Sequence, residues 1–233
     1  MEWQSMDGIP LFFGGSFDPF HRGHKAIVKK LWQHFPSQPI ILLPNRVSPL
    51  KLARAISRAQ EITEKIERMA VVLQDLKDEF PTIDLHLELF ELQGSQETPS
   101  YTADTLRCLL NSSKFSSVQT PKTSDSRSCI LAMGWDSFCT LEYWKDWEYL
   151  LHTCLLVIFR RREGNLFPCP EISRRAKYIL LELDEPCSSS ELRKLLGRNG
   201  DEEAGLEYLL GPRQLRYIRK HKLYLAHQKL VKI

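Results

Sequence analysis

Two histidines, His21 and His24, lie three residues apart directly after the stretch GGSFDPF. A helical pattern begins near His21, so both imidazoles fall on the first helical turn and face the same way. Gly14 and Gly15 allow the backbone to turn sharply there and to approach a ligand closely. A helix N-terminus offers free N–H groups and partial positive charge to an anion. Each histidine alone would indicate only a polar residue at a helix start, but together they suit a phosphate chain whose charge grows as a bond breaks.

A second helix start lies near the other end of the chain, in SSSELRKLL at 188–196. Serines before a helical run are a typical N-cap signal, and taken alone they predict a capped helix with one exposed arginine, Arg193. The sequence has no GxGxxG string and no GKS or GKT, which disfavours a dinucleotide fingerprint and a P-loop.

The elements that must position these residues alternate between strands and helices. Short apolar runs bounded by Pro, Gly or polar residues are typical of strands buried on both faces. The segment 83–92 instead alternates apolar and polar residues, which predicts a strand with one face in water, at an edge of the sheet. Over 57–80 the apolar spacing of three and four predicts a long helix, with a capping box at Ser57 and Gln60 and a stop at Pro81. The apolar runs that predict buried strands are 9–15, 38–44, 129–134, 154–159 and 177–183.

This alternation predicts an α/β fold: a doubly wound, mainly parallel sheet with helices on both faces. The long helix has only about three heptads, which favours packing on the sheet over a coiled coil. In such a sheet the ligand crevice lies beyond the carboxyl ends of the strands. We expect a single domain over 1–233, with an exposed, flexible Ser/Thr-rich loop at 111–128 and a C-terminal helical part from about 188.

The composition is that of an ordinary globular chain, with 42% hydrophobic and 26% charged residues among 233. The net charge of +3 gives little support to nucleic-acid binding, although the tail IRKHKLYLAHQKLVKI is basic. The start of the chain does not resemble a signal peptide and no apolar run is long enough to span a bilayer, so we expect no membrane partner. The six cysteines are scattered without a CxxC pair, which favours reduced packing residues and a cytoplasmic protein.

The string GGSFDPFHRGH resembles the signature (T/G)xFDPxHxGH of the HxGH nucleotidyltransferase superfamily. SSSELR resembles a second motif of that superfamily, (S/T)SSTxIR, with Ser190 and Leu192 in place of the usual Thr and Ile. In the superfamily this motif holds the β- and γ-phosphates of the nucleotide at a helix N-terminus. The resemblance implies a Rossmann-like nucleotidyltransferase fold with His21, His24 and Arg193 as catalytic residues. The ATP-binding residues that it implies in these two motifs are Gly14, Gly15, Ser16, Phe17, Gly23, Ser189 and Ser190.

Further segments resemble the bacterial nicotinate-nucleotide adenylyltransferase family: LPNRVSPLK (43–51), TPSYTADTL (98–106), LAMGWDSFCTLEYWKDWEYLL (131–151) and the closing LRYIRKHKLY. The resemblance implies Lys51 as a catalytic, phosphate-contacting lysine, although Leu50 replaces the usual His before it. It also implies that Gly134 and Asp136 bind ATP. The residues that it implies for the mononucleotide are Asp18, Lys51, Tyr101, Thr102, Asp104 and Trp144.

Considered without the family, several of these residues have plainer interpretations. Trp144 would indicate a core residue rather than a platform for a pyridine ring. Asp104 and Asp136 would serve as simple helix caps. Arg160 follows a strand and is as typical of a solvated charge as of a phosphate contact, and Arg68 in the long helix indicates a surface or structural residue.

The resemblance implies transfer of AMP from ATP to nicotinate mononucleotide, giving deamido-NAD and pyrophosphate. The acceptor phosphate is already an anion and needs no general base, so the protein has to place two anions in line and neutralise charge. Magnesium (Mg2+) is expected to arrive with ATP, held mainly by phosphates and water rather than by a dedicated protein cluster.

Two alternatives stay open. One is the same transfer to nicotinamide mononucleotide. The other is a non-catalytic nucleotide-binding protein of this fold, which predicts the loss of HxGH, Lys51 or the distal arginine. The expected partners are the small molecules ATP and nicotinate mononucleotide, with no nucleic acid, and the oligomeric state is left open.

Overall fold

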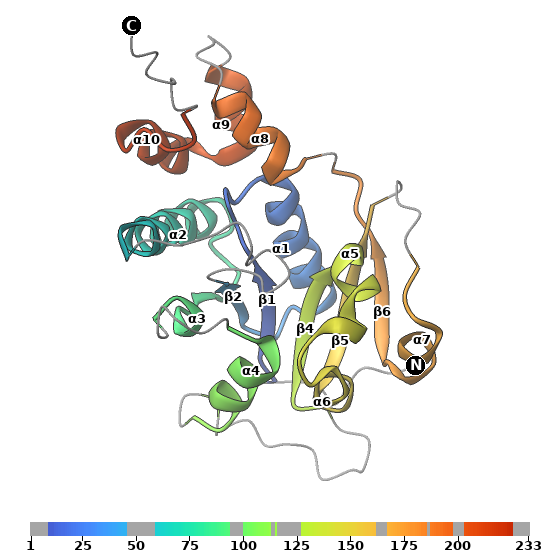
Figure 1. The fold of residues 1–233 in the computed structure, drawn as a ribbon. Helices are drawn as coiled ribbons and strands as arrows, with labels where there is room; N and C mark the ends of the chain where they lie inside the picture. The colour runs from blue at the N-terminus through green and yellow to red at the C-terminus, as the bar shows by residue number, and fades with distance from the viewer. Residues whose placement is uncertain are drawn as a thin grey trace, which may run out of the picture.

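The computed structural model describes residues 9–45, 59–93, 100–112, 115, 127–161, 167–185, 187–197 and 203–225. Within this part, six parallel strands form one sheet in the order β3-β2-β1-β4-β5-β6 (Figure 1). The predicted α/β fold with a parallel sheet is therefore confirmed. The strands are β1 (Leu11–Gly15), β2 (Ile40–Pro44), β3 (Leu85–Leu87), β4 (Cys129–Gly134), β5 (Cys154–Arg160) and β6 (Tyr178–Glu182).

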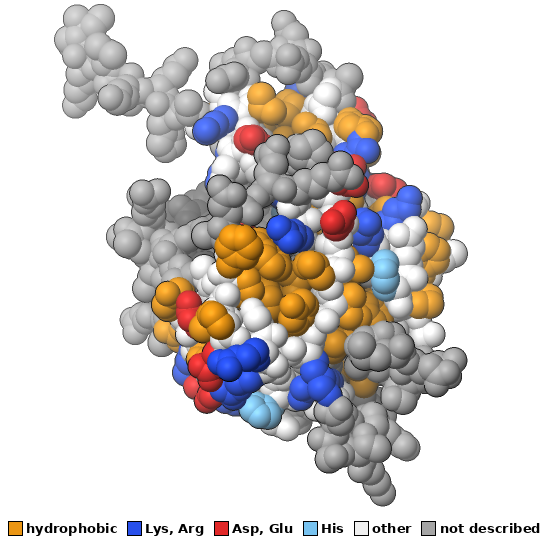
Figure 2. All heavy atoms as spheres, turned by 90° about the vertical axis from the view of Figure 1, so that its right-hand side faces the viewer, with side chains coloured by type: hydrophobic (Ala, Val, Ile, Leu, Met, Phe, Trp, Pro, Cys, Tyr) orange, Lys and Arg blue, Asp and Glu red, His pale blue; other side chains and the backbone are white. Residues whose placement is uncertain are grey.

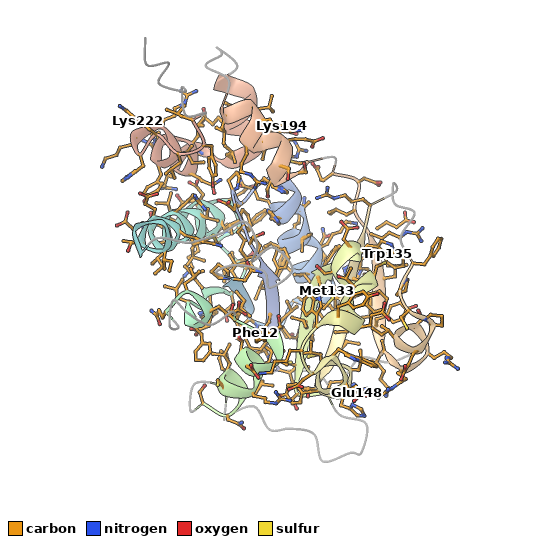
Figure 3. All side chains as sticks on the ribbon, in the orientation of Figure 1. Phe12, Met133, Trp135, Glu148, Lys194 and Lys222 are labelled. Atoms are coloured by element: carbon orange, nitrogen blue, oxygen red, sulfur yellow. The ribbon has the colours of Figure 1, made fainter. Side chains whose placement is uncertain are left out.

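Helices cover both faces of this sheet. On one face, α1 (Arg22–His34) and α2 (Ala59–Glu79) pack their apolar sides on the strands, and Val28, Leu31 and Met69 are fully buried there. The other face is covered by α4 (Thr102–Leu110), α5 (Trp135–Cys139), the 3-10 helix η2 (Leu141–Tyr143), α6 (Trp147–Thr153) and α7 (Pro170–Arg175). Phe12 and Met133, labelled in Figure 3, belong to this second core.

The C-terminal helices form a third apolar cluster of their own. They are α8 (Ser189–Leu196), α9 (Glu203–Leu210) and α10 (Pro212–Lys220), and Leu192, Leu206 and Leu215 are among the residues they bury. In Figure 1 these helices lie past one end of the sheet, above α1. They therefore stand at the edge of the sheet where a ligand crevice is expected.

The segment 83–92 lies at an edge of the sheet, as predicted, but it is not one long strand. β3 pairs with β2 through only three residues, and the chain then turns into the short helix α3 (Phe90–Gln93). Glu91 is buried in this helix and accepts hydrogen bonds from Ser100 and Thr105. These tertiary contacts override the alternating pattern of the sequence.

The run 177–183 forms β6, the opposite edge strand, and not a strand buried on both faces. Tyr178 and Leu180 are 39% and 42% exposed, whereas Ile179 and Leu181 pack against the first core. Figure 2 shows hydrophobic side chains gathered on this side of the molecule. The prediction was wrong because a continuous apolar run does not distinguish an edge strand from a central one.

The long helix α2 ends at Glu79, two residues before Pro81, as predicted. Its predicted capping serine, Ser57, lies outside the described residues, and so does most of the 111–128 loop. All six cysteines are free, and four of them are buried, which confirms their interpretation as reduced packing residues.

Candidate active site

The first turn of α1 holds both histidines through their own ring nitrogens. His21 is the N-cap residue, and its Nδ1 accepts a hydrogen bond from the Gly23 N–H at 3.1 Å. The Nδ1 of His24 accepts one from the His21 N–H at 3.2 Å. Because Nδ1 is an acceptor in each ring, the single ring proton of each neutral imidazole lies on Nε2. The turn therefore fixes two Nε2–H donors at a helix N-terminus.

Burial keeps these two rings uncharged. Burial, together with the positive charge of Arg161, lowers the pKa of His21 from 6.5 to about 4. Burial, the neighbouring His21 and Arg161 together lower the pKa of His24 well below the usual value. At neutral pH the pair is thus a set of preorganised neutral donors, and cationic charge near it comes from arginine.

Aromatic packing holds the histidine turn in place. The Phe17 ring is 1% exposed and lies with its centroid 5.1 Å from that of His24 and 5.3 Å from that of Phe20. The side chain of Phe17 is therefore part of the core, so its predicted contact with ATP is restricted to its backbone. Phe17 also has a φ of 45°, so the left-handed backbone of this loop falls on Phe17 and not on Gly14 or Gly15.

The glycines around the histidine turn differ in the space that surrounds them. A Cβ on Gly15 would lie 2.7 Å from the Phe17 ring, and one on Gly23 would lie 3.0 Å from the His21 ring. Both positions therefore need glycine for space. A Cβ on Gly14 would have no neighbour within 4 Å, so this glycine leaves open room at the carboxyl end of β1. Ser16, beside them, is exposed.

The N-terminus of α8 docks on this same loop, so the structure brings the two predicted phosphate motifs together. The Ser189 hydroxyl donates a hydrogen bond to the Pro19 carbonyl at 3.0 Å. Arg193 donates one to the Asp18 carbonyl and another, at 3.1 Å, to the exposed Ser190 hydroxyl. Two helix N-termini that lie more than 160 residues apart in the chain thus meet at one loop.

The Asp18 carboxylate is occupied by protein partners. Arg68 donates to it at 2.8 Å, and the Tyr224 hydroxyl also donates to it. Burial alone would raise the pKa of Asp18, but Arg68, Tyr224, Lys65 and Arg193 lower it below the usual value. The structure thus gives Asp18 a network role, and its contact with the mononucleotide stays a prediction. Arg68 is buried, which contradicts a surface position and supports the structural alternative.

On the acceptor side, α4 and the Trp144 segment lie next to each other. Tyr101 is the N-cap residue of α4, Thr102 is its first residue, and the Lys145 ammonium lies 5.0 Å from the centre of the Tyr101 ring. The Asp104 carboxylate accepts hydrogen bonds from Lys145 at 2.8 Å and from Arg107 at 3.2 Å. Asp104 therefore joins the two segments, in addition to any contact with a ligand.

The remaining predicted residues have fewer contacts that relate them to a ligand site. Trp144 is half-buried against the second core, which leaves part of its ring accessible. Gly134 caps α5 at the carboxyl end of β4, and Asp136 is exposed in the first turn of that helix. Arg160 lies over the Trp135 ring, with its guanidinium carbon 4.9 Å from the ring centre. Lys51 and Leu50 lie outside the described residues.

Three side chains of this region were missed by the sequence reasoning. Arg161 follows β5 and acts electrostatically on both histidines, although Arg160 was the residue considered. Lys65 on α2 faces Asp18, and Tyr224 reaches Asp18 from the C-terminal segment. The resemblance of the closing LRYIRKHKLY to the family was the one signal that pointed to Tyr224. No pattern pointed to Lys65.

Residues 12–195 match the model of the cytidylyltransferase-like family, so the chain belongs to this family of nucleotidyltransferases. It is 31% identical to a protein of Pseudomonas paraeruginosa named "Probable nicotinate-nucleotide adenylyltransferase", over 92% of this chain and 96% of that one. A protein of Leptospira interrogans with the same name is 29% identical over 91% of this chain and 94% of the relative. Within the nucleotidyltransferases, the chain is therefore a member of the nicotinate-nucleotide adenylyltransferase family, and the resemblance found in the sequence is confirmed.

The fold has counterparts among solved structures. It is similar to Plasmodium falciparum nicotinic acid mononucleotide adenylyltransferase complexed with APC, with a TM-score of 0.65 and 21% identity, over 92% of this chain and 96% of that chain. The same enzyme complexed with NaAD matches with a TM-score of 0.65 and 20% identity. These likenesses confirm the Rossmann-like nucleotidyltransferase fold.

Two negative findings concern only the described part of the chain. No helix there has the length and apolar character needed to cross a bilayer. No three His, Cys, Asp or Glu side chains gather there in a way that could hold a metal ion.

Proposed function

We propose that the protein transfers the adenylyl group of ATP to nicotinate mononucleotide, giving deamido-NAD and pyrophosphate. The observation that carries this proposal is the contact between the two phosphate motifs, in which Ser189 and Arg193 of α8 hold the loop that leads to His21 and His24. The family membership and the names of the relatives support the same reaction.

In this reaction an oxygen of the mononucleotide phosphate attacks the α-phosphorus of ATP. The bond between that phosphorus and the bridging oxygen breaks, and pyrophosphate leaves with the electron pair. The attacking oxygen carries no proton that has to be removed, so the neutral histidines serve as hydrogen-bond donors and not as bases. Their Nε2–H groups suit the α-phosphate and the bridging oxygen, where charge develops.

The leaving pyrophosphate requires cationic partners. Arg193 and the N-terminus of α8 suit its β- and γ-phosphates, and Arg161 at the end of β5 adds a further positive charge near the histidines. We assign Lys51 to the same task on the basis of its motif. Ser16, Gly14 and the Phe17 backbone line the path of the phosphates at the end of β1 in this proposal.

The mononucleotide is assigned to the region where α4 and the Trp144 segment lie next to each other. The accessible part of the Trp144 ring suits a pyridine, and Tyr101 and Thr102 lie at the start of α4, where a helix N-terminus favours an anion such as the nicotinate carboxylate. Asp136 is assigned to the nucleotide ribose, since it is exposed at the β4–α5 corner.

ATP enters as its magnesium complex in this proposal, with the ion held mainly by phosphate oxygens and water. The ion would neutralise phosphate charge alongside Arg193. All six cysteines are free, which supports a reducing compartment such as the cytoplasm for the reaction.

The deciding experiment is a side-by-side assay of pyrophosphate release with ATP and either nicotinate or nicotinamide mononucleotide. We expect turnover with nicotinate mononucleotide and a kcat/KM at least about tenfold lower with the amide, because the amide lacks the carboxylate charge. A preference for the amide would identify nicotinamide mononucleotide as the acceptor, with the same adenylyl transfer. ATP binding without turnover on either acceptor would support a non-catalytic nucleotide-binding protein instead.

A further inference from the structure

Lys65 lies on α2 and contacts the chain where β2 ends. Its ammonium donates a hydrogen bond to the backbone carbonyl of Asn45, the first residue after β2. The Asn45 N–H in turn donates to the Gly15 carbonyl at 3.0 Å. Lys65 therefore holds the end of β2 beside the end of β1, where the first phosphate loop begins.

Two carboxylates from different elements act electrostatically on the Lys65 ammonium. They are Asp18, in the loop after β1, and Glu91, in α3, while Arg68 of the same helix is the neighbouring positive charge. Glu91 accepts hydrogen bonds from the Ser100 hydroxyl at 2.7 Å and from the Thr105 hydroxyl at 3.1 Å. Ser100 precedes Tyr101 and Thr105 follows Asp104, so Glu91 connects Lys65 to the start of α4.

Two buried polar atoms on the residues around Lys65 and Asp18 have no hydrogen-bond partner among the described residues. They are Asn45 Oδ1 and Arg68 Nε. One is an acceptor and the other is a donor. Asn45 and Arg68 thus keep unused hydrogen-bonding capacity next to Lys65 and Asp18.

We propose that Lys65 is a positioning residue of the acceptor site, whose positive charge holds Asn45, Asp18 and Glu91 together and so fixes the three segments around the mononucleotide. This inference rests on the proposed function for the identity of the acceptor. Lys65 acts through these partners, so its loss is expected to weaken binding of the mononucleotide.

The charge of Lys65 is sensitive to pH in a range that experiments reach easily. Burial lowers the pKa of Lys65 from 10.5 to about 8, and Arg68 acts in the same direction, while Asp18 and Glu91 oppose it. The ammonium is therefore charged at pH 7 and largely neutral at pH 9. The carboxylate of nicotinate mononucleotide is fully ionised over that interval and its phosphate is already about nine-tenths dianionic at pH 7, so a large loss of affinity reports on the protein.

The test compares wild type, Lys65→Met, Lys65→Arg and the control Lys77→Met, an exposed lysine on the same helix. Nicotinate mononucleotide binding is measured by calorimetry at pH 7 and pH 9, and kcat and KM for both substrates are measured at each pH. Lys65→Met is expected to fold at pH 7, because the lowered pKa means that the buried charge weakens the folded state there.

In the expected result, wild type binds the mononucleotide about tenfold more weakly at pH 9 than at pH 7, since about nine-tenths of the charge is lost. Lys65→Met binds on the order of tenfold more weakly at both pH values, because a charge-assisted hydrogen bond is removed. Lys65→Arg binds the mononucleotide as tightly at pH 9 as at pH 7, because arginine does not titrate in that range. Lys77→Met behaves like wild type.

The inference is overturned if Lys65→Met binds the mononucleotide as tightly as wild type, or if Lys65→Arg weakens at pH 9 as wild type does. Failure of the proposed function gives a different pattern. Wild type would then bind nicotinate mononucleotide with the expected pH dependence but release no pyrophosphate. That result would support the positioning role of Lys65 and contradict adenylyl transfer to this acceptor. A wild type that does not bind this mononucleotide at all contradicts both.

Discussion

The imidazole rings of His21 and His24 are stacked, with their centroids 3.8 Å apart and their planes inclined by 29°. Two charged imidazoles would repel each other at that distance, and burial already disfavours their charge. The stack is therefore an arrangement for neutral rings, each with its proton on Nε2. A polyphosphate is offered two donors whose orientation is fixed before it binds, and such preorganisation lowers the cost of reaching the transition state.

Replacing His24 by Ala is expected to lower kcat by a factor on the order of 10² to 10³, because one preorganised donor to the reacting phosphate is removed. The variant also loses the hydrogen bond from the His21 N–H and part of the packing around Phe17, so its Tm should fall by a few degrees. Pyrophosphate release and thermal unfolding measure the two effects. His34→Ala, an exposed histidine in the last turn of α1, is the matched control. Near-wild-type turnover in folded His24→Ala would contradict the assignment of the donor.

Acid should destabilise the protein through His21. Its pKa is about 4 in the folded state against 6.5 for the ordinary histidine, so between these values the unfolded chain binds more protons than the folded chain. The contribution of His21 to the free energy of unfolding is therefore fully present above about pH 6.5. It falls by about 3 kcal/mol as the pH is lowered toward 4.

This pH dependence can be measured by urea unfolding at pH 7 and pH 4.5. His21→Asn keeps a side-chain acceptor at the N-cap but does not titrate, so the variant should lose markedly less stability on acidification than wild type. Parallel losses in both proteins, or an NMR titration of His21 near 6.5, would show that the ring is not held neutral.

Arg193→Lys is expected to raise the KM for ATP and to lower kcat/KM by a factor of about 10 to 100. Lysine keeps the charge, but it cannot reach the Asp18 carbonyl and the Ser190 hydroxyl together as the planar guanidinium does. Lys194→Ala provides the control, because Lys194 is the next residue of α8 and is exposed (Figure 3). Wild-type kinetics in Arg193→Lys would mean that charge alone is required.

Gly23→Ala tests the space that the histidine turn needs. The added Cβ would lie 3.0 Å from the His21 ring, so the ring has to move away from the Gly23 N–H. We expect a loss of about 1 kcal/mol from the weakened cap and a fall in kcat on the order of a hundredfold from the misplaced donor.

Gly205→Ala is the control for that substitution. Gly205 lies inside α9, where a Cβ would have no neighbour within 4 Å, so alanine should raise stability by about 0.5–1 kcal/mol and leave kcat unchanged. An active Gly23→Ala variant with an intact turn would contradict the steric argument.

The histidine turn could be predicted because its hydrogen bonds are local in the sequence. The hydrogen bonds of His21 with Gly23 and His24 join residues two and three apart, so a fixed string of letters encodes them. The parallel sheet could be predicted for a similar reason, since short apolar runs separated by helices have few other ways to bury their surface.

The network around Asp18 could not be predicted, because each partner comes from a distant part of the chain. Arg68 is 50 residues away and Tyr224 is 206 residues away. On α2, Lys65 and Arg68 have the spacing of ordinary charged helix positions, and only the packing of α2 beside the loop turns them inward. The same cause explains why the edge strand predicted over 83–92 is shorter than expected, since contacts of Glu91 with Ser100 and Thr105 outweigh the local pattern.

The C-terminal helices bury a cluster of their own, and they reach the histidine loop through polar contacts from Ser189, Arg193, Gln214 and Tyr224. A nucleotide that contacts both His21 and Arg193 therefore also strengthens the attachment of this tail to the sheet. By thermodynamic reciprocity, anything that loosens the tail reduces nucleotide affinity by the same factor by which the nucleotide tightens the tail. The C-terminal helices thus influence how tightly substrate is held, in part through Gln214 and Tyr224, which have no assigned contact with it.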